Sequence, residues 1–134
     1  MKAYEFFTLP NFIDTKGSLV PVELKDFIDW EPKRVYYAFN NKELRGGHCH
    51  KIEKELFICP KGSFKVRLHD GKNWIEKFLT GPNSAVRVDN WIWHEFTDFT
   101  DDAILLALSS TNYNKDDYIR DFDQYIKSIK ALEK

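Results

Sequence analysis

The stretch Arg45-Gly46-Gly47-His48-Cys49-His50-Lys51 carries two histidines separated by a single residue. In a β-strand, side chains two residues apart point to the same side, so we expect His48 and His50 to share one space while Cys49 faces away. Two imidazoles in one cavity suit either proton transfer near neutral pH or metal binding. The stretch therefore predicts a strand that carries a site of one of these two kinds.

Length and composition predict a single domain over residues 1–134, which is long enough for a hydrophobic core. Phe, Tyr and Trp make up 16% of the chain, and such rings favour strands and can line a ligand cavity. The net charge is −1 and no basic stripe stands out, so nucleic acid is not an expected partner.

The N-terminus has no secretory signal pattern, and no apolar run reaches membrane-spanning length. We therefore expect no membrane association and a cytoplasmic location. The two cysteines, Cys49 and Cys59, have neither CxxC nor zinc-knuckle spacing, which predicts reduced thiols with a packing role.

Turn-forming residues divide the chain into short segments, and the segments between them have β-type patterns. The expected strands are residues 4–9, 34–39, 45–51, 55–58, 63–69, 74–79, 85–88 and 104–109. Residues 63–69 alternate between apolar and polar, and Asp70-Gly71 predicts a hairpin to residues 74–79. Residues 104–108 have no polar face and are expected to be buried on both sides. Many short strands at regular spacing predict an all-β sandwich or barrel.

The C-terminal stretch has a different period. From Asp116 onward, Tyr, Ile and Phe recur at helical spacing with Asp and Lys between them, and Asn114 is a candidate N-cap. This pattern predicts an amphipathic helix that packs on the exterior of the barrel, rather than one that binds a partner.

The spacing of possible ligands is that of a cupin, a jelly-roll β-barrel. His48-x-His50 is followed at the expected distances by Glu55 and Gly62, and His94 takes the place of the histidine in the second cupin motif. The glycines and the proline that flank these motifs in cupins are absent. In their places stand Lys42, Asp89 and Trp91.

Longer stretches make the resemblance more specific. They are Lys33-Arg34-Val35-Tyr36-Tyr37, Arg45 to Lys51, Leu56-Phe57-Ile58-Cys59, Gly62-Ser63, Trp93-His94-Glu95 and Asp117-Tyr118-Ile119-Arg120. In order and spacing the chain resembles the dTDP-4-keto-6-deoxyglucose 3,4-ketoisomerases, from Gly17 to Tyr125. The resemblance implies a cytoplasmic, homodimeric isomerase of deoxysugar biosynthesis for surface glycans, which uses neither metal nor cofactor.

The resemblance also assigns roles. It implies that His48 and His50 are the catalytic pair and that a tyrosine of the preceding strand contributes, with Tyr36 as first choice and Tyr37 as second. The pair would move protons through an enediol as the carbonyl passes from C4 to C3 of the sugar.

Several further residues are candidates for binding the dTDP-linked 4-keto-6-deoxyhexose. Arg45, with Arg34 and Arg67, is expected to bind the diphosphate. Trp93 or Trp91 is expected to cover the thymine or the sugar. His94 is a further binding candidate, with holding a loop as its alternative, and His69 is expected to be solvated.

Glu55 leaves a second function open. Ketoisomerases often carry Gln at this place, and a carboxylate restores a possible metal set of His48, His50, Glu55 and His94. The alternatives are therefore a metal-dependent cupin enzyme, such as a dioxygenase or isomerase, and a non-catalytic sugar-binding cupin. The dimer is supported only by aromatic strands and by residues 4–9, which are a candidate for pairing across a two-fold axis.

Overall fold

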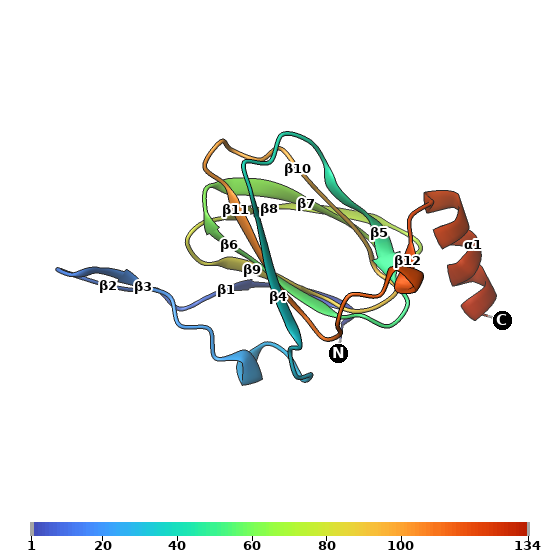
Figure 1. Ribbon diagram of the computed structural model, residues 1–134, viewed down its shortest axis with the longest axis horizontal. Coiled ribbons are helices and arrows are strands. Elements are labelled where there is room, and N and C mark those ends of the chain that lie inside the picture. Colours follow the sequence, from blue (N-terminus) through green and yellow to red (C-terminus); the bar gives the residue numbers. More distant parts are fainter. Residues whose placement is uncertain (1, 134) are drawn as a thin grey trace.

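A computed structural model describes residues 2–133, which form two packed antiparallel sheets, a projecting hairpin and one C-terminal helix (Figure 1). The strands are β1 Tyr4–Thr8, β2 Phe12–Asp14, β3 Gly17–Leu19, β4 Arg34–Phe39, β5 Arg45–His50, β6 Glu55–Lys61, β7 Ser63–His69, β8 Trp74–Thr80, β9 Ser84–Val88, β10 Trp93–Thr97, β11 Ile104–Ser109 and β12 Tyr118–Ile119. Short 3-10 turns cover Leu24–Asp26 and Lys115–Asp117, and helix α1 covers Phe122–Leu132. The all-β prediction with a C-terminal helix is confirmed.

The two sheets enclose the core. One has the strand order β1-β9-β6-β11-β4 and the other β12-β5-β10-β7-β8. As the alternation of residues 63–69 predicts, Phe64, Val66 and Leu68 of β7 are fully buried between the sheets. Phe96 of β10 contacts Phe57 of the opposite sheet edge to face, with ring centroids 4.7 Å apart. Aromatic packing of this kind holds the two layers together at one end of the barrel.

The outer face of the first sheet is covered in part by the chain segment that precedes β4. Val22, Phe27 and Trp30 pack against Leu56 and Ile58 of the sheet. The two-sided burial predicted for residues 104–108 is therefore only half correct. Leu105 and Ala107 are buried inside the barrel, whereas Ile104, Leu106 and Leu108 are half-buried on the outer face.

The C-terminal helix begins later than the periodicity predicts. The Asn114 side chain caps the 3-10 turn by accepting the Asp116 N–H, and β12 then pairs with β5. Helix α1 starts at Phe122, where Asp121 is the N-cap and accepts the Gln124 N–H. Tyr118 and Ile119 thus pair with the edge of β5 although their spacing fits a helix, because helical periodicity is only a local preference. As predicted, α1 packs on the exterior of the barrel, with Tyr125 against Trp93 and Cys49.

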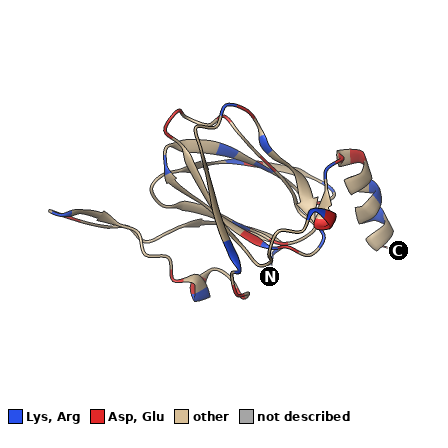
Figure 2. Cartoon of the chain, in the orientation of Figure 1, with Lys and Arg blue, Asp and Glu red and all other residues tan. Residues whose placement is uncertain are grey.

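Strand β1 pairs along one edge with β9, Tyr4 opposite Val88, and is the last strand of its sheet. Its pairing with a second copy across a two-fold axis stays a prediction. The hairpin β2–β3 projects away from both sheets, on the side remote from α1 (Figure 1). Basic and acidic residues are interspersed over the sheets and α1 (Figure 2), in keeping with the balanced net charge. Within residues 2–133, no helix has the length and apolar character needed to cross a membrane.

Candidate active site

Strand β5 brings the two histidines into the barrel because of its neighbours in the sheet. His48 lies opposite His94 of β10, and His50 lies opposite Tyr118 of β12. Gly46 has φ +80°, and a Cβ there would come within 2.7 Å of the His94 carbonyl oxygen. Only glycine permits this close approach of the strands, so the glycines before the histidines belong to the architecture of the site.

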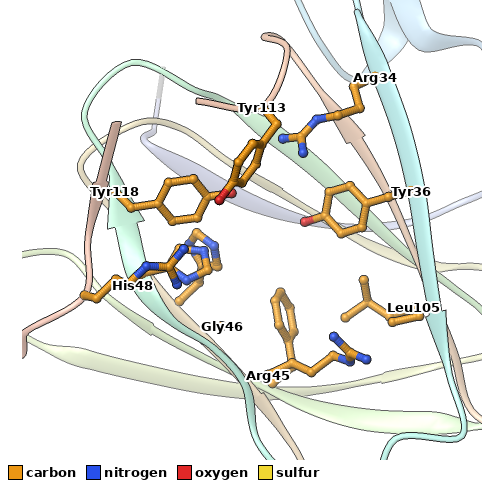
Figure 3. Close-up of a pocket in the computed structure, with 12 residues that line it drawn as sticks. Arg34, Tyr36, Arg45, Gly46, His48, Leu105, Tyr113 and Tyr118 are labelled. Atoms are coloured by element: carbon orange, nitrogen blue, oxygen red, sulfur yellow. The ribbon is translucent and has the colours of Figure 1, made fainter. Parts of the chain in front are cut away.

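A cavity of about 330 Å³ opens beside β5 (Figure 3). Of the predicted site residues, the cavity wall contains Arg34, Tyr36, Arg45, His48 and His94. The hydroxyl groups of Tyr36 and Tyr118 point into this space from strands on opposite sides (Figure 3). The cavity therefore combines imidazole, phenol and guanidinium groups within one concave surface.

The three inward histidines pack against one another. The ring of His48 lies 4.9 Å from that of His50 and 4.7 Å from that of His94, both edge to face. His48 lines the cavity, whereas His50 is only 2% exposed and lies deeper, with the Tyr118 ring 4.3 Å away. Cys49 faces the other way, as predicted, and is buried beneath α1.

Burial keeps these imidazoles neutral. Desolvation, followed by the neighbouring histidines, lowers the pKa of His48 to about 2. Desolvation and His50 lower the pKa of His94 to about 3. Burial also lowers the pKa of His50, although Glu53 and Asp117 act in the opposite direction. At neutral pH each ring is therefore uncharged, with one nitrogen that donates a hydrogen bond and one that accepts.

Two buried carboxyl groups, those of Glu53 and Glu55, lie behind the histidines. Tyr36 Oη donates to Glu55 Oε1 at 3.1 Å, and Ser109 Oγ contacts both carboxyl groups, at 3.2 and 3.1 Å. Arg34 pairs with Glu53 at 2.9 Å.

Burial and the adjacent Glu53 raise the pKa of Glu55 well above its usual range. Burial also acts to raise the pKa of Glu53, but hydrogen bonding with Glu55 and the proximity of His50 outweigh it and lower that pKa. The pair therefore holds one proton more firmly than two free carboxylates would.

Two predicted binding residues, Tyr37 and Arg67, lie outside the cavity. Tyr37 points to the outer face of β4, where it is 65% exposed, because neighbouring residues of a strand alternate in direction. Arg67 lies on the outer face of its sheet, where it pairs with Glu76 at 2.7 Å and Glu95 at 2.8 Å.

The structure also places neither of the two candidate tryptophans in the cavity. Trp93 is buried beneath α1 against Phe122 and Tyr125, and Trp91 joins the same cluster, so neither lines the cavity. His69, predicted to be solvated, is only 6% exposed and contacts the rings of Trp74 and Phe122. The helix that covers this face of the sheet accounts for both placements.

Three cavity residues escaped the sequence analysis: Tyr113, Tyr118 and Arg120. The Arg120 guanidinium lies 4.3 Å from the Tyr118 ring centre, and the Tyr113 ring lies 5.8 Å from that of Tyr118. The signal was present in Asp117-Tyr118-Ile119-Arg120, which belongs to the family resemblance. Helical periodicity assigned Tyr118 and Arg120 to a helix on the exterior instead, and no signal in the sequence pointed to Tyr113.

The donor set also bears on the metal alternative. The ring nitrogens of His48, His50 and His94 lie within 4.8 Å of one another, and the same holds for the donor atoms of His50, Glu53 and Glu55. No such grouping of the described residues holds the predicted set of two histidines, Glu55 and His94 together. Either triplet has donor types that a divalent first-row metal accepts, and His50 belongs to both.

Comparison with known proteins identifies the family. The family model described as "FdtA: WxcM-like, C-terminal" matches residues 2–130. The chain belongs to this family. A curated relative, TDP-4-oxo-6-deoxy-alpha-D-glucose-3,4-oxoisomerase of Aneurinibacillus thermoaerophilus, is 40% identical over 124 residues, which are 91% of this chain and 89% of the relative.

Solved structures of FdtA-like ketoisomerases have the same fold. A 3,4-ketoisomerase from Helicobacter canadensis is 33% identical with a TM-score of 0.88, covering 95% of this chain and 97% of its own. QdtA, the 3,4-ketoisomerase of Thermoanaerobacterium thermosaccharolyticum, was solved as a histidine-to-asparagine mutant in complex with TDP-4-keto-6-deoxyglucose. It is 32% identical with a TM-score of 0.89, covering 98% of this chain and 96% of its own. The resemblance read from the sequence is thus confirmed.

Proposed function

We propose that this FdtA-family chain is a sugar-nucleotide 3,4-ketoisomerase, which converts TDP-4-keto-6-deoxyglucose into a TDP-3-keto-6-deoxyhexose. One observation carries the proposal. A neutral His48 and the Tyr36 hydroxyl lie in the wall of the same cavity, with His50 directly behind His48. The names of the relatives supply the sugar, and the side chains of this cavity supply the proton-transferring groups that its isomerisation requires.

The reaction relocates protons without net oxidation. A base removes the proton from C3, which the C4 ketone makes acidic, while an acid protonates the C4 oxygen to give an enediol. The C3 hydroxyl then loses its proton and C4 regains one, so the carbonyl has moved from C4 to C3. We assign His50 to the transfer between carbon and oxygen, and His48 to orienting it or acting as the second acid or base.

Tyr36 is assigned to the developing enediolate oxygen. Its hydroxyl already donates a hydrogen bond, to Glu55 Oε1 at 3.1 Å, and burial followed by the charge of Glu55 raises its pKa. The phenol therefore keeps its proton and can donate it in a hydrogen bond to an oxygen that gains negative charge.

The arginines of the wall are assigned to the diphosphate. Arg45 and Arg120 line the cavity, and no carboxylate within residues 2–133 pairs with either. Arg34 is engaged with Glu53, so it is less available. A guanidinium group can donate two parallel hydrogen bonds to one phosphate group. Arg45 and Arg120 can do so inside the cavity, whereas Arg67 points outward.

The decisive experiment is incubation with TDP-4-keto-6-deoxyglucose in heavy water, followed by proton NMR. We expect loss of the C3 proton signal, a ketone at C3 and deuterium at C4. Binding of the nucleotide sugar without any change in its spectrum would instead indicate the non-catalytic sugar-binding alternative.

The metal-dependent alternative is supported by the two donor triplets around His50. Elemental analysis of freshly purified protein tests it directly. Stoichiometric iron, manganese or nickel, together with turnover that a chelator abolishes and the metal restores, would favour this alternative. Unchanged turnover in the presence of chelator supports the acid–base route.

We further propose that the protein is a homodimer. In the projecting hairpin β2–β3, Phe12, Ile13 and Leu19 are 63%, 74% and 66% exposed. A hairpin of this kind is marginally stable alone and buries its apolar side chains when it lies on another surface. On the outer face of β4, Val35, Tyr37 and Phe39 offer such a surface. A cytoplasmic location and a surface glycan as destination remain part of the proposal on the strength of the family resemblance.

A further inference from the structure

The carboxylate of Asp117 closes the turn that follows the histidine strand. Its Oδ1 accepts the backbone N–H groups of Lys51 at 3.1 Å and Ile52 at 2.8 Å, and its Oδ2 accepts that of Glu53 at 3.0 Å. The side chain is 5% exposed and comes from the far end of the chain. Three charge-assisted bonds to consecutive amides fix the backbone between His50 and Glu53 more firmly than an ordinary loop contact would.

The same carboxylate faces the imidazole of His50. Asp117 Oδ2 lies 3.6 Å from His50 Nδ1, a buried nitrogen with no hydrogen-bond partner within residues 2–133. Oδ2 accepts only the Glu53 N–H, so it has a lone pair left for a second donor, whereas Oδ1 already accepts two. This arrangement favours the tautomer of His50 that carries its proton on Nδ1.

The other edge of the ring faces the inner carboxyl groups. His50 Nε2 lies 3.7 Å from Glu53 Oε2 and 3.9 Å from Glu55 Oε2, on the side where Glu55 receives the Tyr36 hydroxyl. With the proton held on Nδ1, Nε2 presents its lone pair to this side. A carboxylate that orients an imidazole from behind is a general device of acid–base catalysis.

We propose that Asp117 is a positioning residue of the ketoisomerase: it holds the turn 51–53, and its negative charge 3.6 Å from Nδ1 keeps the proton of His50 on that nitrogen, so that Nε2 is the atom that exchanges protons. The inference rests on the proposed function and names a residue that acts through His50 rather than on the sugar. It also explains why a 3-10 turn and a two-residue strand, rather than a continuous helix, precede α1, because they bring Asp117 back to β5.

The kinetic test compares Asp117→Asn with Asn114→Ala. The asparagine amide keeps an oxygen for two backbone N–H groups but carries no negative charge beside His50 Nδ1. Asn114→Ala removes the cap of the same 3-10 turn, from Asp116 N–H to Asn114 Oδ1, without touching His50. We expect kcat of Asp117→Asn to fall about 100-fold or more with KM within about threefold, since the wrong tautomer impairs proton transfer rather than binding. Asn114→Ala should change kcat less than about threefold. Equal kcat losses in the two variants would overturn the proposal.

A spectroscopic test depends neither on turnover nor on a change at Asp117. In the wild-type protein, long-range proton–nitrogen NMR of the histidine rings identifies which nitrogen carries the proton. His50 is assigned by comparison with His50→Asn. We expect Nδ1 to be protonated and Nε2 to be free, and a proton on Nε2 instead would refute the assignment. If the wild-type protein fails to isomerise the sugar, the proposed function fails, while this measurement still decides the role of Asp117.

Discussion

At the residue scale, burial and neighbours decide what each of the four histidines does. His48 and His94 lie in the cavity wall, His50 is buried behind His48, and His69 is packed beneath α1 on the outside of the barrel. Their ordinary pKa values are identical, but desolvation lowers each, so that none carries a permanent charge at neutral pH. Catalytic competence therefore depends on position relative to the cavity.

The first prediction concerns the histidine pair. His50→Asn should lower kcat by about 10²- to 10⁴-fold while leaving affinity for the nucleotide sugar within several-fold, because the imidazole moves protons and does not bind the diphosphate. His48→Asn should retain slow deuterium exchange at C3, since His50 remains. Steady-state kinetics, a binding titration and NMR exchange measure these effects. His69→Asn is the matched control, and near-normal turnover of His50→Asn would contradict the assignment.

The second prediction is a loss of stability at mildly acidic pH. In the fold His48 and His94 keep pKa values of about 2 and about 3, so below pH 6.5 the unfolded chain binds protons there that the native state does not. Each contributes stability that falls with decreasing pH. Glu55 acts in the opposite direction, because its raised pKa lets the native state hold a proton above pH 4.5 that the unfolded chain releases.

Burial also lowers the pKa values of His50 and His69, so the unfolded chain binds more protons than the native state over this range. The free energy of unfolding should therefore fall by about 1 kcal/mol or more for each pH unit between 6.5 and 5. Urea unfolding at both pH values measures it. His94→Gln should reduce the slope, and a stability that is the same at both pH values would refute this account.

At the element scale, strand pairing rather than local preference sets where elements begin and end. The apolar spacing from Tyr118 to Ile129 fits one helix, yet Tyr118 and Ile119 pair with β5 and the helix starts at Phe122. An open strand edge next to the histidines supplies hydrogen bonds that a longer helix would forgo.

The third prediction concerns the tight turn between β6 and β7. Gly62 has φ +71°, and a Cβ there would lie 2.6 Å from the Ala103 Cα. Gly62→Ala combines a disfavoured backbone with a clash against the main chain, so it should lower the free energy of unfolding by about 2–4 kcal/mol. Gly17→Ala is the control, since Gly17 has φ +133° but nothing within 4 Å of the added Cβ. Urea unfolding of both variants distinguishes clash from strain, and equal losses would show that the clash is relieved.

At the scale of the whole molecule, the hairpin β2–β3 and the outer face of β4 leave apolar side chains exposed. Hairpin β2–β3 stands clear of both sheets, as Figure 1 shows, and carries exposed Phe12 and Ile13. The outer face of β4 is equally apolar. On the side covered by α1, Tyr125 and Ile126 pack on the sheet.

The fourth prediction is that the hairpin stabilises the homodimer. Ile13→Lys should shift the protein from dimer toward monomer, because a charge would be buried where an apolar side chain packs. Light scattering coupled to size-exclusion chromatography measures the change. Lys16→Ala, on the same hairpin, should leave the dimer intact, and an unchanged mass for Ile13→Lys would contradict this prediction.

The sequence by itself determined the properties that depend on near neighbours. Because side chains alternate along a strand, the sequence placed His48 and His50 on one face and Cys49 on the other. The same alternation identified Phe64 and Val66 as core residues. The order of the motifs indicated the family. Each follows from backbone periodicity and the few residue types that a turn or a close strand contact permits.

Only the tertiary structure decided which distant residues meet the histidines. Tyr118 and Asp117 reach His50 through strand pairing and a capped turn. Arg67 and Trp93 lie on strands β7 and β10, but their side chains face outward. These outcomes depend on the register of strands that lie far apart along the chain, and a shift of one residue exchanges the two faces of a sheet. Local patterns do not contain that register, because it is set by the packing of the whole barrel.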